Sequence, residues 1–254
     1  DHTLERWDWA YYSEKLRKKK YDLDDEVIKP YFKLENVIEG VFKTAEKLYG
    51  LSFVRNNEAP VYHEDVEVYE VWNEGKIKAV FLADFFPRDG KRGGAWMSDA
   101  QSYIQYENWN EKPIAYLVCN FQESERPTLT FSDVETLFHE FGHSLHHLLT
   151  QRSLPSIAGI NEVPWDIVEL PSQLQEQWCF EEAILKQLSQ HKTTGESLPD
   201  EKIKNIIDSR HFHASLHLIR QLEFAKFDWS IHALEHCEDP IEFWKDLRKD
   251  IAVT

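Results

Sequence analysis

The stretch Leu137-Phe138-His139-Glu140-Phe141-Gly142-His143 contains a His-Glu-x-x-His motif inside an amphipathic segment. Two histidines four residues apart lie one above the other on one face of a helix, so both imidazoles can reach a single metal ion. Glu140 lies close enough on the same surface to contact a water molecule on that metal. Because three fixed letters also occur by chance, the surrounding sequence has to support a metal site.

The surrounding sequence predicts that the motif lies on one long helix over about residues 133–149. Ser132 followed by Glu135 is typical of a capping box at a helix start. Apolar residues then recur with the helical period, and they are Val134, Leu137, Phe138, Phe141, Leu145, Leu148 and Leu149.

A catalytic zinc site needs a third protein ligand and one position left open for water. Two acidic residues downstream are candidates, Glu162 and Glu169. Glu162 precedes Pro164 and therefore lies near an expected helix start, where a capping or solvated carboxylate is common. Glu169 is flanked by apolar residues, and a carboxylate in such surroundings is costly unless it is paired or bound to metal. We favour Glu169; Glu162 would indicate an aminopeptidase instead.

Several segments resemble the thimet oligopeptidase family of zinc endopeptidases, with the bacterial oligopeptidase A branch as the nearest. They are Trp7-Asp8-Trp9-Ala10-Tyr11-Tyr12, Lys91-Arg92-Gly93-Gly94-Ala95-Trp96-Met97, Ala115-Tyr116-Leu117-Val118-Cys119-Asn120-Phe121, residues 139–149, residues 163–173 and Arg220-Gln221-Leu222-Glu223-Phe224. The resemblance runs through nearly the whole chain. It implies that His139, His143 and Glu169 hold one zinc ion and that Glu140 is the general base.

The function that follows is hydrolysis of internal peptide bonds in short oligopeptides. Zinc lowers the pKa of its bound water to about 7, which makes hydroxide available at neutral pH. Glu140 would accept a proton as that water attacks the peptide carbonyl, and would then pass it to the leaving amine.

Two parts of the family pattern do not occur in residues 1–254. They are a long helical N-terminal half and a downstream segment whose His and Tyr bind substrate and oxyanion. We therefore expect an internal part of a longer catalytic domain, with short peptides and the absent segments of the same enzyme as partners. Two competing hypotheses are a zinc-binding but catalytically silent fragment and a non-enzymatic peptide-binding module, and the presence of Glu140 argues against the second.

Composition narrows the class of protein further. The formal net charge of −16 disfavours nucleic acid and anionic membranes as partners. A hydrophobic content of 42% with 13% aromatic residues argues against disorder. No apolar run approaches the roughly 20 residues that span a membrane. The 3 cysteines are odd in number and far apart, which predicts reduced thiols and a cytoplasmic location.

The order of the patterns predicts an α+β fold, mainly α-helical with a small antiparallel sheet, of the zincin-like metallopeptidase type. Since no repeat or clear linker interrupts the chain, we expect one partial catalytic domain over 1–254. The expected strands are 66–72, 77–85 and 113–121, with a turn at Asn73-Glu74-Gly75. The expected helices are 3–20, 34–49, 133–149, about 164–189, 199–209, 212–235 and 240–252.

Further polar residues have two interpretations each. His146 and His147 are more typical of packed or solvated helix residues than of partners to a metal ligand. Asp166 suits either a hydrogen bond to a ligand histidine or a helix N-cap. Residues 91–94 suit either an approach to substrate or a tight turn. The 113–121 segment resembles the family's edge strand, along which an extended peptide would pair.

Overall fold

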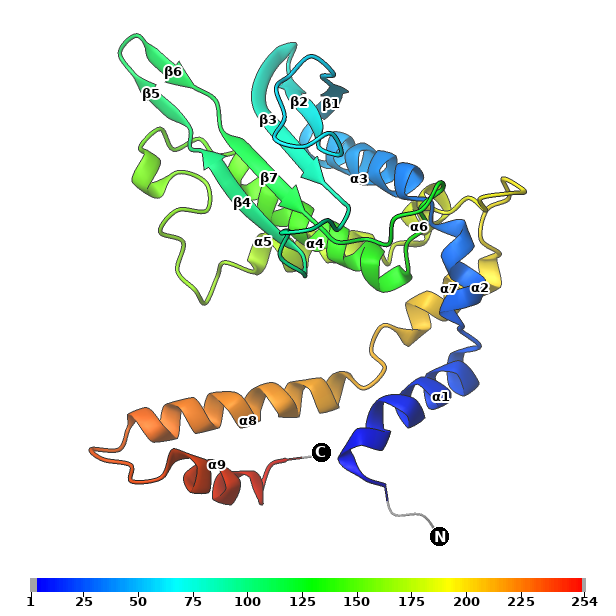
Figure 1. Ribbon diagram of the computed structural model, residues 1–254, viewed down its shortest axis with the longest axis vertical. Coiled ribbons are helices and arrows are strands. Elements are labelled where there is room, and N and C mark those ends of the chain that lie inside the picture. The colour runs from blue at the N-terminus through cyan, green and yellow to red at the C-terminus, as the bar shows by residue number, and fades with distance from the viewer. Residues whose placement is uncertain (1–3, 253–254) are drawn as a thin grey trace. The chain divides into compact units, whose positions relative to one another are not determined.

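The computed structural model describes residues 4–252, which form two compact units (Figure 1). One unit comprises residues 24–207, and the other combines the chain up to residue 23 with the chain from residue 208. The single domain expected over 1–254 stays a prediction, because compact packing units are not by themselves folding domains. The described helices are α1 (Trp9–Tyr21), α2 (Asp25–Ile28), α3 (Leu34–Tyr49), α4 (Phe131–Leu148), α5 (Leu170–Trp178), α6 (Glu182–Leu188), α7 (Asp200–Ser209), α8 (Ala214–His232) and α9 (Pro240–Arg248).

The 24–207 unit contains a five-stranded sheet in the order β1-β2-β3-β7-β4, and β5 and β6 form a separate hairpin. Its neighbours pair antiparallel except β3 and β7, which run parallel. The expected α+β class is confirmed, but the sheet is mixed, because the chain passes through β4, β5 and β6 before it returns beside β3. The strands are β1 (Leu51–Arg55), β2 (Glu67–Asn73), β3 (Lys76–Asp84), β4 (Trp96–Gln101), β5 (Ile104–Tyr106), β6 (Trp109–Glu111) and β7 (Ile114–Val118).

The predicted hairpin is present as β2 and β3, and Glu74 and Gly75 between them both have positive φ, as a tight hairpin turn requires. The strand expected at 113–121 is β7. It lies inside the sheet between β3 and β4, so its predicted place at the edge is wrong. The edge strand beside it is β4, which the sequence pattern did not reveal.

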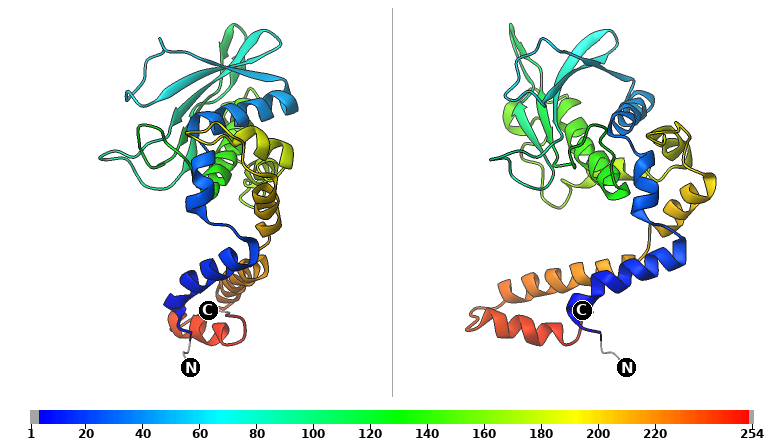
Figure 2. Two further views of the ribbon diagram at one scale, coloured as in Figure 1. Left: turned by 90° about the vertical axis from the view of Figure 1, so that its right-hand side faces the viewer. Right: turned by 45° about the vertical axis from the view of Figure 1, so that its right-hand side comes forward.

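Helices α3 and α4 pack on the same face of this sheet, as Figure 2 shows. Aromatic rings fill the layer between them. Phe141 of α4 is buried and contacts Phe42 of α3, Phe53 of β1 and Phe81 of β3, with ring centroids 5.6–5.8 Å apart. Since offset and edge-on aromatic pairs stabilise beyond their buried area, this cluster fixes α4 against the sheet.

The helix expected over about 164–189 is wrong as a single element. Residues 165–169 form turns, α5 begins at Leu170, and α6 follows after a break at residues 179–181. Pro171 explains the start, because proline is tolerated only in the first turn of a helix. The helix expected at 34–49 is confirmed as α3, and Gly50 ends it in the left-handed region at φ 67°.

The second unit is helical. The helix expected over 3–20 begins at Trp9 after a short 3₁₀ turn, and Thr3 lies outside the described residues. Glu223 of α8 is 1% exposed and pairs with Arg220 at 2.9 Å and with Arg248 of α9 at 2.6 Å. The Arg220–Phe224 segment therefore has a structural role within this unit. Within the described range, no helix combines the length and the apolar character that crossing a bilayer demands.

A buried carboxylate fixes the loop that leads into β4. Asp84, the last residue of β3, is 2% exposed and accepts two hydrogen bonds of 2.8 Å from the Arg88 guanidinium. Lys91 Nζ donates to the same carboxylate at 2.8 Å, and the Tyr62 hydroxyl donates at 2.9 Å. Lys91 also donates to the Cys119 carbonyl oxygen at 2.6 Å. The loop before β4 is thereby held against the ends of both β3 and β7.

This cluster predicts acid-sensitive stability. Burial alone would raise the pKa of Asp84, but hydrogen bonds from Arg88, Lys91 and Tyr62 hold it at about 2, below the ordinary 3.8. A carboxyl with a depressed folded-state pKa stabilises the fold above its unfolded pKa, and that stabilisation is lost as pH falls through the folded value. We expect the free energy of unfolding to drop by about 2 kcal/mol between about pH 5 and pH 2 through this group.

Urea unfolding across this pH range measures the effect. Asp84→Asn should remove this part of the pH dependence. It should also cost about 3–5 kcal/mol near neutral pH, since it leaves the buried Lys91 charge without its counter-ion. Asp89→Asn makes the same change at an exposed position and is the matched control. If the Asp84→Asn variant were as stable and as acid-sensitive as the unmodified chain, Asp84 would not be the source of the acid sensitivity.

Candidate metal centre

Helix α4 begins earlier than the sequence pattern predicts. Its N-cap is Thr130, whose hydroxyl accepts a hydrogen bond of 3.1 Å from the Asp133 N–H, while the Asp133 carboxylate accepts one of 2.9 Å from the Thr130 N–H. The capping box expected at Ser132 and Glu135 is therefore wrong, because the same device operates two positions upstream with aspartate in place of glutamate. The helix itself, Phe131–Leu148, carries the whole motif.

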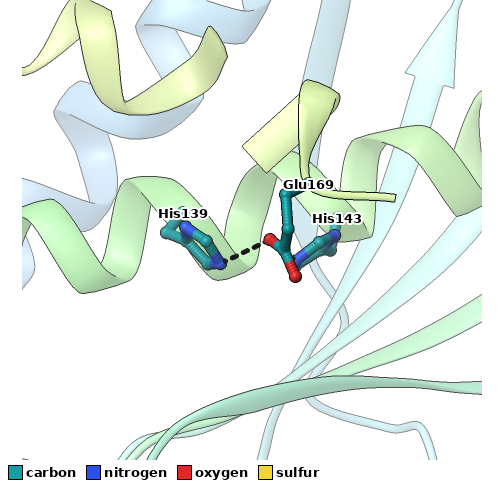
Figure 3. Close-up of side chains that lie close together, drawn as sticks. All are labelled: His139, His143 and Glu169. Carbon is teal, nitrogen blue, oxygen red and sulfur yellow. Dashed lines mark ion pairs between the residues drawn. The ribbon is translucent and has the colours of Figure 1, made fainter. Parts of the chain in front are cut away.

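Three side chains from α4 and the start of α5 converge on one point (Figure 3). Glu169 Oε2 lies 3.2 Å from His139 Nε2 and 3.1 Å from His143 Nε2. Their donor atoms all lie within 4.8 Å of one another. The structure thus brings together the three residues that the sequence favours as ligands, and their role as ligands remains a prediction.

The spacing of these atoms suits a tetrahedral metal ion. Bonds of about 2.0–2.2 Å in a tetrahedron put neighbouring donor atoms roughly 3.3 Å apart. The two histidine–glutamate separations, 3.2 Å and 3.1 Å, are close to that value. Two imidazole nitrogens with one carboxylate oxygen also form a donor set that divalent zinc favours.

The apolar surroundings that favour Glu169 in the sequence are not buried in the structure. Its flanking residues Ile167 and Leu170 are exposed, and the Glu169 side chain is itself 50% exposed. What places the carboxylate is its position as the N-cap residue of α5, where the helix dipole favours negative charge. Glu162 lies in the preceding loop, exposed and with φ 55°, and is not part of the cluster found among the described residues.

Ser172 holds the Glu169 carboxylate in place. The Ser172 hydroxyl is within hydrogen-bonding distance of Glu169 Oε2 at 2.8 Å and of the Glu169 carbonyl oxygen at 2.9 Å, and Ser172 is fully buried. Burial alone would raise the pKa of Glu169, but the Ser172 hydrogen bond and the neighbouring His143 and His139 lower it below the ordinary value. The carboxylate is therefore kept ionised, as a metal ligand must be.

Glu176 is a functional candidate that the sequence patterns do not single out. Its Oε1 accepts a hydrogen bond of 2.5 Å from His139 Nδ1, with the tautomer assigned from this partner. The contact leaves the His139 Nε2 lone pair directed at the cluster and makes the imidazole a stronger ligand. A usable signal exists, because Glu176 lies about two helical turns beyond Glu169 and so on the same side of α5.

Glu140 lies beside the cluster and is buried. It is 8% exposed and lies near the backbone N–H of Met97 in β4. Burial raises the pKa of Glu140, and the negative Glu169 raises it further, while His139 and the Met97 N–H act in the opposite direction. Burial likewise lowers the pKa of His143, which keeps that imidazole neutral and free to bind metal.

The other polar candidates are not among the clustered residues. His147 is fully buried, and its Nε2 hydrogen-bonds the Gln101 carbonyl oxygen at 2.9 Å, which ties α4 to the end of β4. Residues 93–94 form a bend in the loop that Lys91 holds against the ends of β3 and β7. Asp166 is exposed and lies upstream of α5, whose N-cap residue is Glu169, so the proposed N-cap role is wrong.

A His-Glu-x-x-His helix whose two imidazoles meet a carboxylate from a following helix is an arrangement typical of metallopeptidases. The chain belongs to Peptidase family M3, whose sequence profile matches residues 1–254. The family resemblance predicted from the motifs is thereby confirmed.

Curated relatives agree with this family. The chain is 41% identical over 235 residues to oligopeptidase A of Escherichia coli K12, covering 91% of this chain and 35% of that protein. It is 40% identical over 242 residues to dipeptidyl carboxypeptidase of the same bacterium, covering 93% and 35%. It is 34% identical over 261 residues to saccharolysin of Saccharomyces cerevisiae, covering 97% and 37%. The chain therefore spans little more than a third of the length of these relatives.

The contact between Glu176 and His139 is testable by metal affinity. Glu176→Gln should weaken binding of a divalent metal about 10–100-fold, because the imidazole loses the charged acceptor that orients it. Competition with a chromophoric chelator measures this affinity. Glu181→Gln, an identical change at an exposed position, should leave it unaltered. Equal affinities for both variants would show that Glu176 does not support the site.

Proposed function

We propose that this chain is the zinc-binding catalytic portion of a peptidase that hydrolyses internal bonds of short peptides. The observation that carries the proposal is the convergence of His139, His143 and Glu169, in which Glu169 Oε2 lies 3.2 Å and 3.1 Å from the two imidazole nitrogens and all donor atoms lie within 4.8 Å. Membership of Peptidase family M3 supports it. Residues 1–254 are proposed to form part of one catalytic domain.

In this proposal His139, His143 and Glu169 hold one zinc ion, and a fourth position stays open. Zinc bound there would act as a Lewis acid toward the peptide carbonyl and lower the pKa of water at the site. Glu176 keeps His139 in the tautomer that presents Nε2. Ser172 keeps the Glu169 carboxylate ionised and directed at both imidazoles.

Glu140 is proposed to be the general base. A base works best when its pKa lies near the working pH, and burial raises the pKa of Glu140 toward that range. Its carboxylate would accept a proton from the attacking water and later give it to the amine of the leaving fragment. The nearby Met97 N–H would favour the ionised form of this carboxylate.

The substrate is proposed to extend the sheet at β4. This strand pairs only with β7 among the described strands, and Glu140 lies against it through Met97. An extended peptide can add to such an edge through backbone hydrogen bonds, which recognise length and conformation more than side chains. This placement replaces the 113–121 strand, which lies inside the sheet.

Dipeptide release from a carboxyl end is a second candidate function, because 40% identity links the chain to a dipeptidyl carboxypeptidase nearly as closely as 41% links it to oligopeptidase A. A catalytically silent zinc-binding fragment and a non-enzymatic peptide-binding module compete with both activities. A reducing, cytoplasmic location is proposed because none of the cysteines in the described residues, Cys119, Cys179 and Cys237, forms a disulfide.

Zinc titration tests the ligand assignment. His139→Ala and Glu169→Gln should each weaken zinc binding more than Glu176→Gln does, since they remove a ligand and not its support. Glu162→Gln is the matched control and should bind as the unmodified chain does. If Glu162→Gln lost zinc and Glu169→Gln kept it, the third ligand would be Glu162 and an aminopeptidase would replace the endopeptidase as the proposed enzyme.

Cleavage of a quenched short peptide tests the activity. We expect zinc-dependent cleavage that a chelator abolishes and that Glu140→Gln lowers about 10²–10⁴-fold without loss of zinc affinity. Peptides with free and amidated carboxyl ends separate internal cleavage from dipeptide release. Zinc binding without cleavage would favour the silent fragment, and chelator-resistant cleavage would contradict a metal mechanism.

A further inference from the structure

Helices α4 and α5 meet at Gly142, the glycine inside the His-Glu-x-x-His motif. A Cβ atom at position 142 would lie 2.6 Å from Ser172 Cα, 2.7 Å from the Pro171 carbonyl oxygen and 2.9 Å from Gln175 Cβ. Non-bonded carbon atoms approach no closer than about 3.5 Å without repulsion. The backbone of α5 therefore occupies the space that any other residue at position 142 would need.

The atoms that would clash at Gly142 are mostly main-chain atoms and cannot rotate away. Gly40 on α3 offers a contrast, because its added Cβ would meet Leu188 Cδ2 at 2.2 Å, which is the far end of a movable side chain. An alanine at position 40 would have to move one methyl group of the buried Leu188 side chain, whereas an alanine at position 142 has to displace the backbone of α5.

Displacement of α5 would reach the cluster directly. Ser172, which contacts Gly142, also hydrogen-bonds Glu169 Oε2 at 2.8 Å, and the same oxygen lies 3.1 Å from His143 Nε2. The contact and the carboxylate are thus joined by one side chain at the first turn of α5. A shift of about 1 Å there is enough to spoil the geometry of a metal site.

We propose that the contact between Gly142 and Ser172 is the positioning element that sets where the Glu169 carboxylate lies relative to the two imidazoles. Gly142 allows α5 to approach α4 closely. The Ser172 hydroxyl then holds the Glu169 carboxylate through its hydrogen bond. Glycine inside a helix lowers helix stability relative to alanine, so its presence in α4 suits a requirement for space. The proposal rests on the proposed zinc site and assigns positioning roles, not catalytic ones.

Zinc affinity of the full chain, measured by chelator competition, tests the proposal. Gly142→Ala should bind zinc about 10–100-fold more weakly than the unmodified chain, as expected for loss of support to a ligand. Gly40→Ala is the matched control and should bind zinc normally. Unchanged zinc affinity in a folded Gly142→Ala variant would overturn the proposal. Equal losses of affinity in both variants would also overturn it, because they would indicate a general disruption of packing.

A double-mutant cycle shows whether the effect passes through Glu169. In a Glu169→Gln background, the further change Gly142→Ala should have little additional effect on zinc affinity, because the carboxylate that it displaces is already gone. Losses that simply add would overturn the proposal. If the unmodified chain bound no zinc at all, the proposed function would fail before the role of Gly142 was reached.

The Ser172 half of the contact gives a test that does not depend on the folding of Gly142→Ala. Ser172→Ala keeps the packing but removes the hydroxyl, and should weaken zinc binding about 10–100-fold. Ser172→Thr, which retains a hydroxyl, should recover part of that affinity. Thermal unfolding of the metal-free variants identifies any change that merely lowers stability. Full zinc affinity in Ser172→Ala would overturn the proposal.

Discussion

Phe141 of α4 packs against α3 and the sheet, and this packing fixes the rotation of α4 about its own axis. Phe141 contacts Phe42, Phe53 and Phe81 in the core, and its neighbours in the motif therefore emerge on other sides of the helix. A turn of the helix that removed Phe141 from this cluster would also misdirect both histidines. The packing of Phe141 in the core and the direction of both histidines therefore require the same rotation of α4 about its axis.

The two carboxylates of Glu140 and Glu169 have opposite environments. Glu140 is buried against β4 and its pKa is raised, whereas the pKa of Glu169, at an exposed helix N-terminus with a Ser172 hydrogen bond, is lowered. Opposite shifts in adjacent titratable groups commonly separate a proton carrier from a fixed charge. The opposite pKa shifts follow from the elements that carry the two residues, since both residues are glutamates.

Local periodicity and turn residues are enough to predict three parts of the fold. These parts are the motif helix α4, the helix α3 that ends at Gly50, and the β2–β3 hairpin. The parallel pairing of β3 with β7 and the edge position of β4 cannot be predicted in this way, since they depend on contacts between distant residues. The apolar neighbours of Glu169 suggest a burial that the structure does not show. Glu176 is harder to predict, because its one signal, a spacing of about two helical turns from Glu169, has meaning only once Glu169 is placed in the cluster.

The exposure of the three donor side chains is uneven, at 14% for His143, 27% for His139 and 50% for Glu169. In the proposed zinc site, the carboxylate on the N-cap of α5 is therefore the donor most open to solvent. For zinc bound there, fraying of the first turn of α5 would release one ligand while α4 stayed packed in the core. Loss of the proposed ion would then require movement of one short helix and not unfolding of the chain.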